Sequence, residues 1–149
     1  MNSIPDQYIS GSWDWVIING GGNDLHKSCD CDETYDPIFG NISSEDGRSG
    51  AVSELVQRST DEGHRVILMG YYFAAKGGDE PTGCGAMIPQ MNPIYEKIAA
   101  SHENTWFVSS GDVITPDHQE YFAEDQLHPS SEGYRVAGEY IAEFIRSLE

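Results

Sequence analysis

Short, continuously apolar runs alternate with amphipathic segments along this chain. The apolar runs cover residues 13–19, 64–72 and 105–108, and they are rich in β-branched and aromatic side chains. Runs of this kind that end in turn residues are typical of strands buried on both faces, as in parallel sheets flanked by helices. The pattern therefore predicts three buried strands.

Between and after these runs, apolar residues recur at the spacing of one helix face. Residues 50–62 and 91–102 show this pattern, and Gly63 supplies a stop signal for the first of them. A final helix begins after Ser130 or Ser131, either of which can cap it. Its expected apolar face consists of Tyr134, Ala137, Tyr140, Ile141, Phe144, Ile145 and Leu148.

Strict alternation of strands and helices predicts parallel strands joined by right-handed crossovers. We therefore expect an α/β fold, a three-layer α/β/α sandwich with a parallel sheet, formed as a single domain by residues 1–149. The long acidic segment 23–50 is expected at the surface, where long loops often carry function.

The composition narrows the classes of partner. With 25 acidic and 8 basic residues the net charge is −17, a sign that repels the phosphates of nucleic acids and anionic membrane surfaces. Such acidity is equally compatible with a solvated surface, a saline environment or a cationic partner. The longest apolar runs are far shorter than the roughly 20 residues of a membrane helix, so we expect no membrane span.

Three cysteines, Cys29, Cys31 and Cys84, permit one disulfide and one free thiol. Either Cys29 or Cys31 could pair with Cys84 and join two glycine-rich loops. Metal binding near these cysteines is disfavoured, because Cys-x-Cys is not a usual structural-zinc spacing. We expect neither a metal nor a cofactor.

Asp125 and His128 carry the clearest candidate chemistry. They stand three residues apart, and Pro129 stiffens the chain after them. At this spacing an aspartate can reach one ring nitrogen of the histidine, fix its tautomer and stabilise the imidazolium that forms when the other nitrogen takes a proton. The alternative interpretation is an acidic helix-capping loop that contains a histidine.

A second candidate segment, Gly21-Gly22-Asn23-Asp24, follows the first predicted strand. Glycines let the backbone approach a ligand, and the Asn23 amide can donate to a developing oxyanion, although such residues are also common in turns. Ligands of open α/β sheets bind beyond the carboxyl ends of the strands. That rule places Asn23 and His128 on one rim of the sheet.

The strand, the Gly-x-Asn-Asp segment and the Asp-x-x-His-Pro segment before a C-terminal helix together resemble the SGNH hydrolases, also called GDSL esterases and lipases. The resemblance extends from Trp13 onward and implies a flavodoxin-like fold and hydrolysis of a small-molecule ester by a Ser-His-Asp triad. It implies that His128 is the general base, Asp125 its orienting carboxylate, and Asn23 with Gly21 the oxyanion or substrate-binding segment. Asp24 is expected to be structural.

The family's Gly-Asp-Ser nucleophile block has no counterpart here, so we identify no nucleophile. Ser109 and Ser110 precede rather than follow a Gly-Asp pair, and Ser10 and Ser12 lie at the wrong end of a strand. We therefore expect an N-terminally short member of the family that is inactive or weakly active by itself. A His128–Asp125 pair could still activate water directly.

Two hypotheses follow. The chain is either an ester hydrolase that needs a complementing unit, or a non-catalytic α/β module for binding or oligomerisation. Because the family's first strands are not found, the strand between Trp15 and Asn19 should be a sheet edge. We expect a second copy, the N-terminal arm or a separate chain to cover it. No leader is visible in the first ten residues, and export in a longer context stays open.

Overall fold

A computed structural model describes residues 4–22, 40–75 and 89–149. Five residues singled out in the sequence lie outside these ranges, and their predicted roles and pairing therefore remain expectations. They are Asn23, Asp24, Cys29, Cys31 and Cys84.

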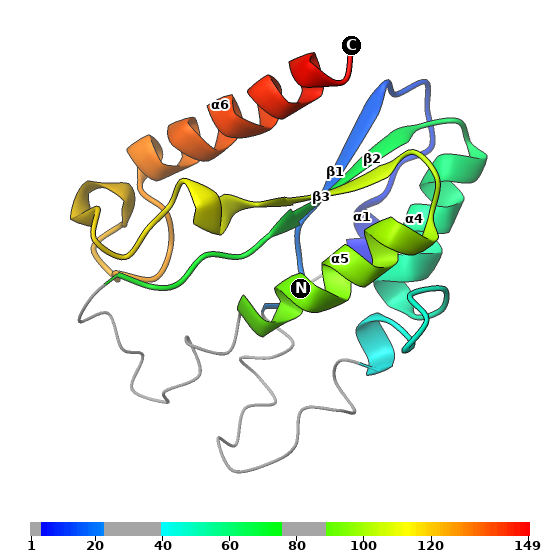
Figure 1. Ribbon diagram of the computed structural model, residues 1–149, viewed down its shortest axis with the longest axis horizontal. Coiled ribbons are helices and arrows are strands. Elements are labelled where there is room, and N and C mark those ends of the chain that lie inside the picture. Colours follow the sequence, from blue (N-terminus) through cyan, green and yellow to red (C-terminus); the bar gives the residue numbers. More distant parts are fainter. Residues whose placement is uncertain (1–3, 23–39, 76–88) are drawn as a thin grey trace.

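Three parallel strands form the sheet in the described part of the chain (Figure 1). They are β1 (Trp15–Ile18), β2 (Arg65–Gly70) and β3 (Thr105–Ser109), in the order β1-β2-β3. Val16 pairs with Val66, and Val66 pairs with Thr105. Each strand begins and ends within two residues of its predicted bounds.

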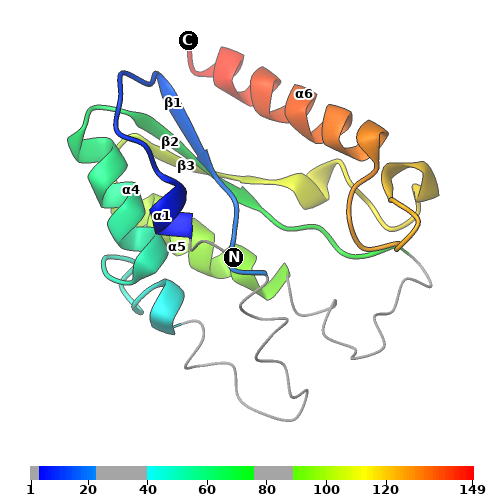
Figure 2. The ribbon, with the colours of Figure 1, turned by 180° about the vertical axis from the view of Figure 1, so that it is seen from behind.

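Helices cover both faces of the sheet. The helices α4 (Ala51–Asp61) and α5 (Asn92–Ser101) lie on one face, and α6 (Ser131–Ser147) lies on the other (Figures 1 and 2). Shorter helical turns are α1 (Ile4–Gln7), η2 (Ser110–Asp112) and η3 (Gln119–Tyr121). The parallel sheet and its two helical layers confirm the predicted α/β class.

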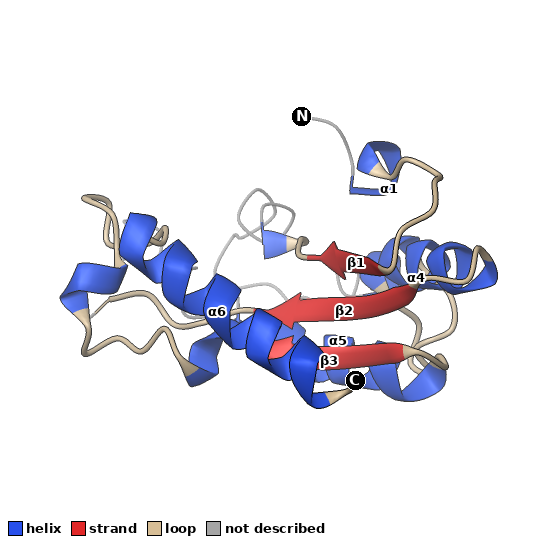
Figure 3. Ribbon diagram, turned by 90° about the horizontal axis from the view of Figure 1, so that it is seen from above, coloured by secondary structure: helices blue, strands red, loops and turns tan. Residues whose placement is uncertain are grey.

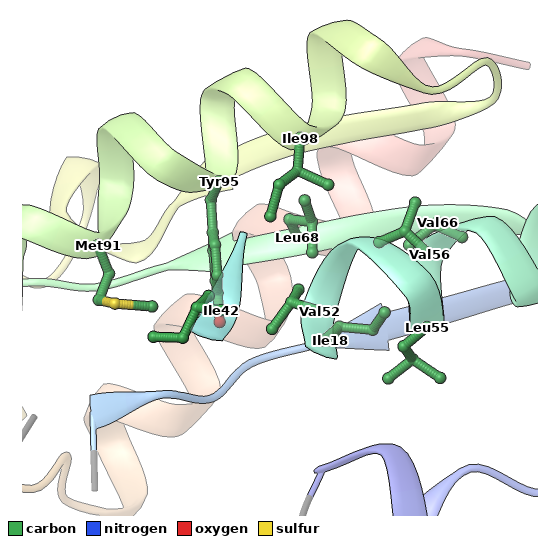
Figure 4. Close-up of a cluster of buried hydrophobic side chains, with 10 residues drawn as sticks. All are labelled: Ile18, Ile42, Val52, Leu55, Val56, Val66, Leu68, Met91, Tyr95 and Ile98. Atoms are coloured by element: carbon green, nitrogen blue, oxygen red, sulfur yellow. The ribbon is translucent and has the colours of Figure 1, made fainter. Parts of the chain in front are cut away.

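The largest apolar cluster fills the space between the sheet and the pair α4 and α5 (Figure 4). Tyr95 and Ile98 of α5 and Val66 of β2 are completely buried in it. A smaller cluster on the opposite face joins Ile67 and Val108 to Ile141 of α6. Continuous apolar strands are explained by this burial on both faces.

The ends of α6 differ from the predicted apolar face. Tyr134 is 61% exposed and Leu148 is 39% exposed, whereas Ala137 and Ile141 between them are buried. Figure 3 shows the reason, because α6 crosses the sheet obliquely and its two ends extend past the strands. Helical periodicity in the sequence does not reveal where a helix leaves its neighbour.

The strand β1 is an edge of the described sheet, as predicted, and Ile17 on it is 50% exposed. The N-terminal arm, residues 4–14, lies beside this edge on the side of α4 (Figure 3). Ile4 and Tyr8 pack against the main cluster. The Tyr8 and Ser10 hydroxyls donate to the two carboxylate oxygens of Glu62, each at 3.0 Å.

Candidate active site

A tight loop before α6 carries Asp125 and His128. The Ala123 N–H donates to the His128 carbonyl at 2.8 Å, and Phe122 forms an isolated antiparallel bridge with Pro129. Gln126 occupies the left-handed region with φ of 59°, which closes the turn between them. The Ser130 hydroxyl caps α6 by accepting from the Gly133 N–H at 3.2 Å. The predicted Ser130 cap is confirmed, and it fixes the exit of the loop.

The structure brings Asp125 and His128 into direct contact. Asp125 Oδ2 lies 2.6 Å from His128 Nδ1. The other carboxylate oxygen accepts from the backbone N–H groups of Leu127 at 3.0 Å and His128 at 2.9 Å. One carboxylate therefore orients the ring and also holds the backbone that carries the ring, which leaves Nε2 as the nitrogen available to exchange a proton.

These contacts set the charge of the carboxyl group. The hydrogen bond from the His128 ring, followed by the backbone N–H groups of His128 and Leu127, lowers the pKa of Asp125 to about 2. The stabilisation that comes with this lowered pKa is fully present above the unfolded value near 3.9, and it is lost as the pH falls through about 2. Both side chains are half exposed or more, so solvent screens the pair and limits its contribution to stability.

Gly20, Gly21 and Gly22 follow β1 at the end of the sheet where all three parallel strands have their carboxyl ends. Gly21 has φ of 88°, a conformation that glycine adopts without strain. The Tyr95 hydroxyl from α5 holds Gly20 by contacting its carbonyl at 2.5 Å and its N–H at 3.1 Å. The backbone that leads to Asn23 is thus anchored to the core, while Asn23 itself lies outside the described residues.

The serines at the end of β3 and directly after it have structural partners. Ser110 is buried, and its hydroxyl donates to the Gly70 carbonyl at 2.6 Å. Ser109 Oγ accepts from the Gly111 N–H at 3.2 Å and caps η2. Ser10 contacts Glu62 and Arg58 at the C-terminal end of α4. Within the described residues, the ring of His128 is hydrogen-bonded only to Asp125.

Two tyrosines that follow β2, and an asparagine at the start of α5, also contact the candidate site. The Tyr72 hydroxyl donates to the Leu127 carbonyl at 3.0 Å, and the Tyr71 hydroxyl accepts from the Gly22 N–H at 3.0 Å. The Asn92 side chain accepts from the Tyr71 N–H and donates to the Tyr71 carbonyl. Aromatic residues at the end of a buried strand usually serve in packing. The signal for a polar role was the choice of tyrosine at both positions, because buried tyrosine hydroxyls usually find a partner.

The described residues contain no cluster of three or more side chains suited to a metal ion. No helix among them is long and apolar enough to cross a membrane.

Comparison with curated proteins and with solved structures gives no match. The sequence model of the GDSL-like lipase/acylhydrolase family matches residues 4–136. This range covers most of the chain and contains all three strands, the glycine segment, Asp125 and His128. The chain belongs to the GDSL-like lipase/acylhydrolase family.

Proposed function

We propose that this chain carries the acid–base half of an ester hydrolase site and that His128 is its general base. The observation that supports the proposal best is the 2.6 Å contact between Asp125 Oδ2 and His128 Nδ1 on an exposed loop. The proposed substrates are small acyl esters or acetyl esters of carbohydrates. Membership in a family of lipases and acylhydrolases supports the same reaction class.

In this scheme Nε2 of His128 removes a proton from a hydroxyl group as that oxygen attacks the ester carbonyl carbon. The bond to the alcohol oxygen then breaks, and the imidazolium returns the proton to the departing alcohol. Asp125 stabilises the imidazolium between these two steps. The Asn23 amide and the Gly21 segment are the proposed donors to the oxyanion.

In the described part of the chain, the His128 ring is hydrogen-bonded to Asp125 and to no serine. The attacking hydroxyl group would therefore have to come from elsewhere. Loss of a triad serine can lower turnover on the order of a million-fold. We therefore propose that the chain alone hydrolyses esters weakly, through water activated by His128. Full activity would require a hydroxyl nucleophile from another source, such as a complementing chain.

Replacing His128 with alanine should abolish this weak activity on a short-chain activated ester such as p-nitrophenyl acetate. Exposed imidazoles attack such esters slowly by themselves, so the matched control is His118→Ala. His118 is also exposed and lies 2.8 Å from a carboxylate oxygen of Glu120. We expect the His118 variant to keep the rate of the native chain.

Labelling with a serine-directed phosphonate completes the experiment. We expect no labelled serine and a rate that depends on His128. One labelled serine would show that the chain holds its own nucleophile. Equal losses in the His118 and His128 variants, or no loss in either, would contradict a special role for His128.

The exposed edge of β1 favours a second candidate function, a module for oligomerisation or for binding a complementing chain. Ile17 is half exposed on this edge, and Trp13 just before it is 52% exposed. An unpaired edge strand presents backbone donors and acceptors to another chain. The like charges of two copies oppose association, so pairing between copies should strengthen at high salt.

Light scattering tests this candidate. We expect a concentration-dependent dimer that Ile17→Lys converts to a monomer, because a lysine on the edge strand blocks pairing. Phe73→Lys is the matched control, since Phe73 is similarly exposed at 54% but lies beyond β2. A monomer at all concentrations and salt levels would count against self-association.

A further inference from the structure

Tyr71 and Tyr72 follow β2 directly, and their side chains enter different parts of the core. Tyr71 packs with the main cluster below the sheet, and its ring lies 6.4 Å from that of Tyr95. Tyr72 packs with a separate cluster that contains Ala75, Ile114, Phe122 and Ala137, and its ring meets that of Phe122 edge-on at a centroid distance of 5.9 Å. The two side chains therefore reach different clusters, although they are neighbours in the sequence.

Each hydroxyl reaches the backbone of a different half of the candidate site. Tyr72 donates to the carbonyl of Leu127, the residue before the proposed base. Tyr71 accepts from the N–H of Gly22 in the glycine segment. The two halves are about 100 residues apart in the sequence, and one dipeptide contacts both.

The backbone at the start of this dipeptide is held by side chains of other elements. The Asn92 side chain at the start of α5 accepts from the Tyr71 N–H at 2.7 Å and donates to the Tyr71 carbonyl at 2.9 Å. Ser110 holds the preceding carbonyl of Gly70 at 2.6 Å. The end of β2 is therefore tied to α5 and to the end of β3, so it can serve as a rigid reference for both hydroxyls.

We propose that Tyr71 and Tyr72 are positioning residues: from the end of β2 they fix the loop that carries Asp125 and His128 relative to Gly21 and Gly22. This inference rests on the proposed function for its catalytic meaning, but the positioning itself can be measured without activity. During ester hydrolysis charge develops both on the base and on the substrate oxygen, so the base and the oxyanion donors must keep a defined distance and orientation. If either is poorly positioned, the rate falls even when every catalytic group is present.

The chemistry of the phenols suits this role. Burial, followed by the nearby Tyr134, Asp125 and Tyr71, raises the pKa of Tyr72 well above its ordinary value. The hydroxyl therefore stays protonated and keeps donating to the Leu127 carbonyl throughout the range in which Asp125 changes charge. The Ala75 N–H adds a second tie to the same loop by donating to the Gln126 carbonyl at 3.1 Å.

The test uses two variants that serve as controls for each other, Tyr71→Phe and Tyr72→Phe. Each removes one oxygen and keeps the aromatic ring. The first readout is the pKa of Asp125 from an NMR titration of its carboxyl carbon. The second is the rate of hydrogen exchange at the Gly22 amide. Far-UV circular dichroism shows that each variant is folded.

We expect a crossed result. Tyr72→Phe should raise the pKa of Asp125 from about 2 toward its ordinary value, by roughly 0.5 or more, because the low value depends on the geometry of the loop. It should leave Gly22 unchanged. Tyr71→Phe should leave Asp125 unchanged and accelerate exchange at Gly22 about tenfold, the effect of losing one hydrogen bond of about 1.4 kcal/mol.

Other patterns overturn the proposal. If both variants move both readouts equally, the tyrosines act only through general packing; if neither readout moves, they do not position the site. Hydrolysis of p-nitrophenyl acetate by the native chain and by His128→Ala tests the proposed function separately. The crossed NMR result supports positioning even if hydrolysis does not depend on His128, and its absence overturns positioning even if hydrolysis does.

Discussion

Replacing Tyr95 with alanine should lower the free energy of unfolding by about 3–5 kcal/mol, the range for truncating a large buried aromatic residue. Tyr95 is completely buried between α5 and the sheet, where Ile42, Met91 and Ile98 belong to the same cluster (Figure 4). Its hydroxyl also contacts the carbonyl and N–H of Gly20. The loss would be a large part of the 5–15 kcal/mol typical of a folded domain. Urea unfolding followed by circular dichroism measures it.

Tyr95→Phe separates the two contributions. The ring remains, so the loss should fall to about 1–3 kcal/mol, the cost of leaving the Gly20 backbone groups without their partner. Because Gly20 leads into the glycine segment, this variant should also increase hydrogen exchange at neighbouring amides. A loss below about 1 kcal/mol for the alanine variant would contradict the buried position of Tyr95.

Replacing Gly133 with alanine should destabilise the protein by about 1–3 kcal/mol or more, as expected when an atom is forced into a packed region. Gly133 lies in the first turn of α6, and an added Cβ would lie only 2.2 Å from the Tyr121 carbonyl oxygen. That oxygen belongs to backbone and also accepts from the Ser130 N–H at 2.8 Å. The clash should therefore push α6 away from the loop that carries His128.

Gly138 on the same helix is the matched control. An added Cβ there meets nothing within 4 Å. Gly138→Ala should therefore stabilise the protein by about 0.5–1 kcal/mol, the difference in helix propensity between the two residues. Thermal unfolding of both variants measures the contrast, and changes of the same sign would contradict the close approach at Gly133.

The sequence predicted the elements whose physical causes are local. The apolar runs of β1 and β2 identify strands because both faces are covered, and Ser130 identifies the start of α6 because its hydroxyl replaces a missing backbone acceptor. The contact between Asp125 and His128 was also predictable, because the two residues are only three positions apart and lie in the same turn.

Contacts between distant segments could not be predicted in this way. Tyr71 and Gly22, or Tyr72 and Leu127, meet only because the sheet aligns the ends of its strands. The exposure of Tyr134 likewise depends on the oblique path of α6. Periodicity describes each segment by itself, whereas these features depend on how the segments are placed.

The register of the sheet has a consequence for how the chain folds. Val16 pairs with Val66, 50 residues later, and Val66 pairs with Thr105, 39 residues later. Neither pair of strands can form as a hairpin, because parallel strands pair only after the segment between them has brought them together. Such non-local topology slows folding and leaves apolar strands exposed while it proceeds. The high negative charge of the chain would then protect it, since mutual repulsion keeps unfolded copies apart until their sheets are complete.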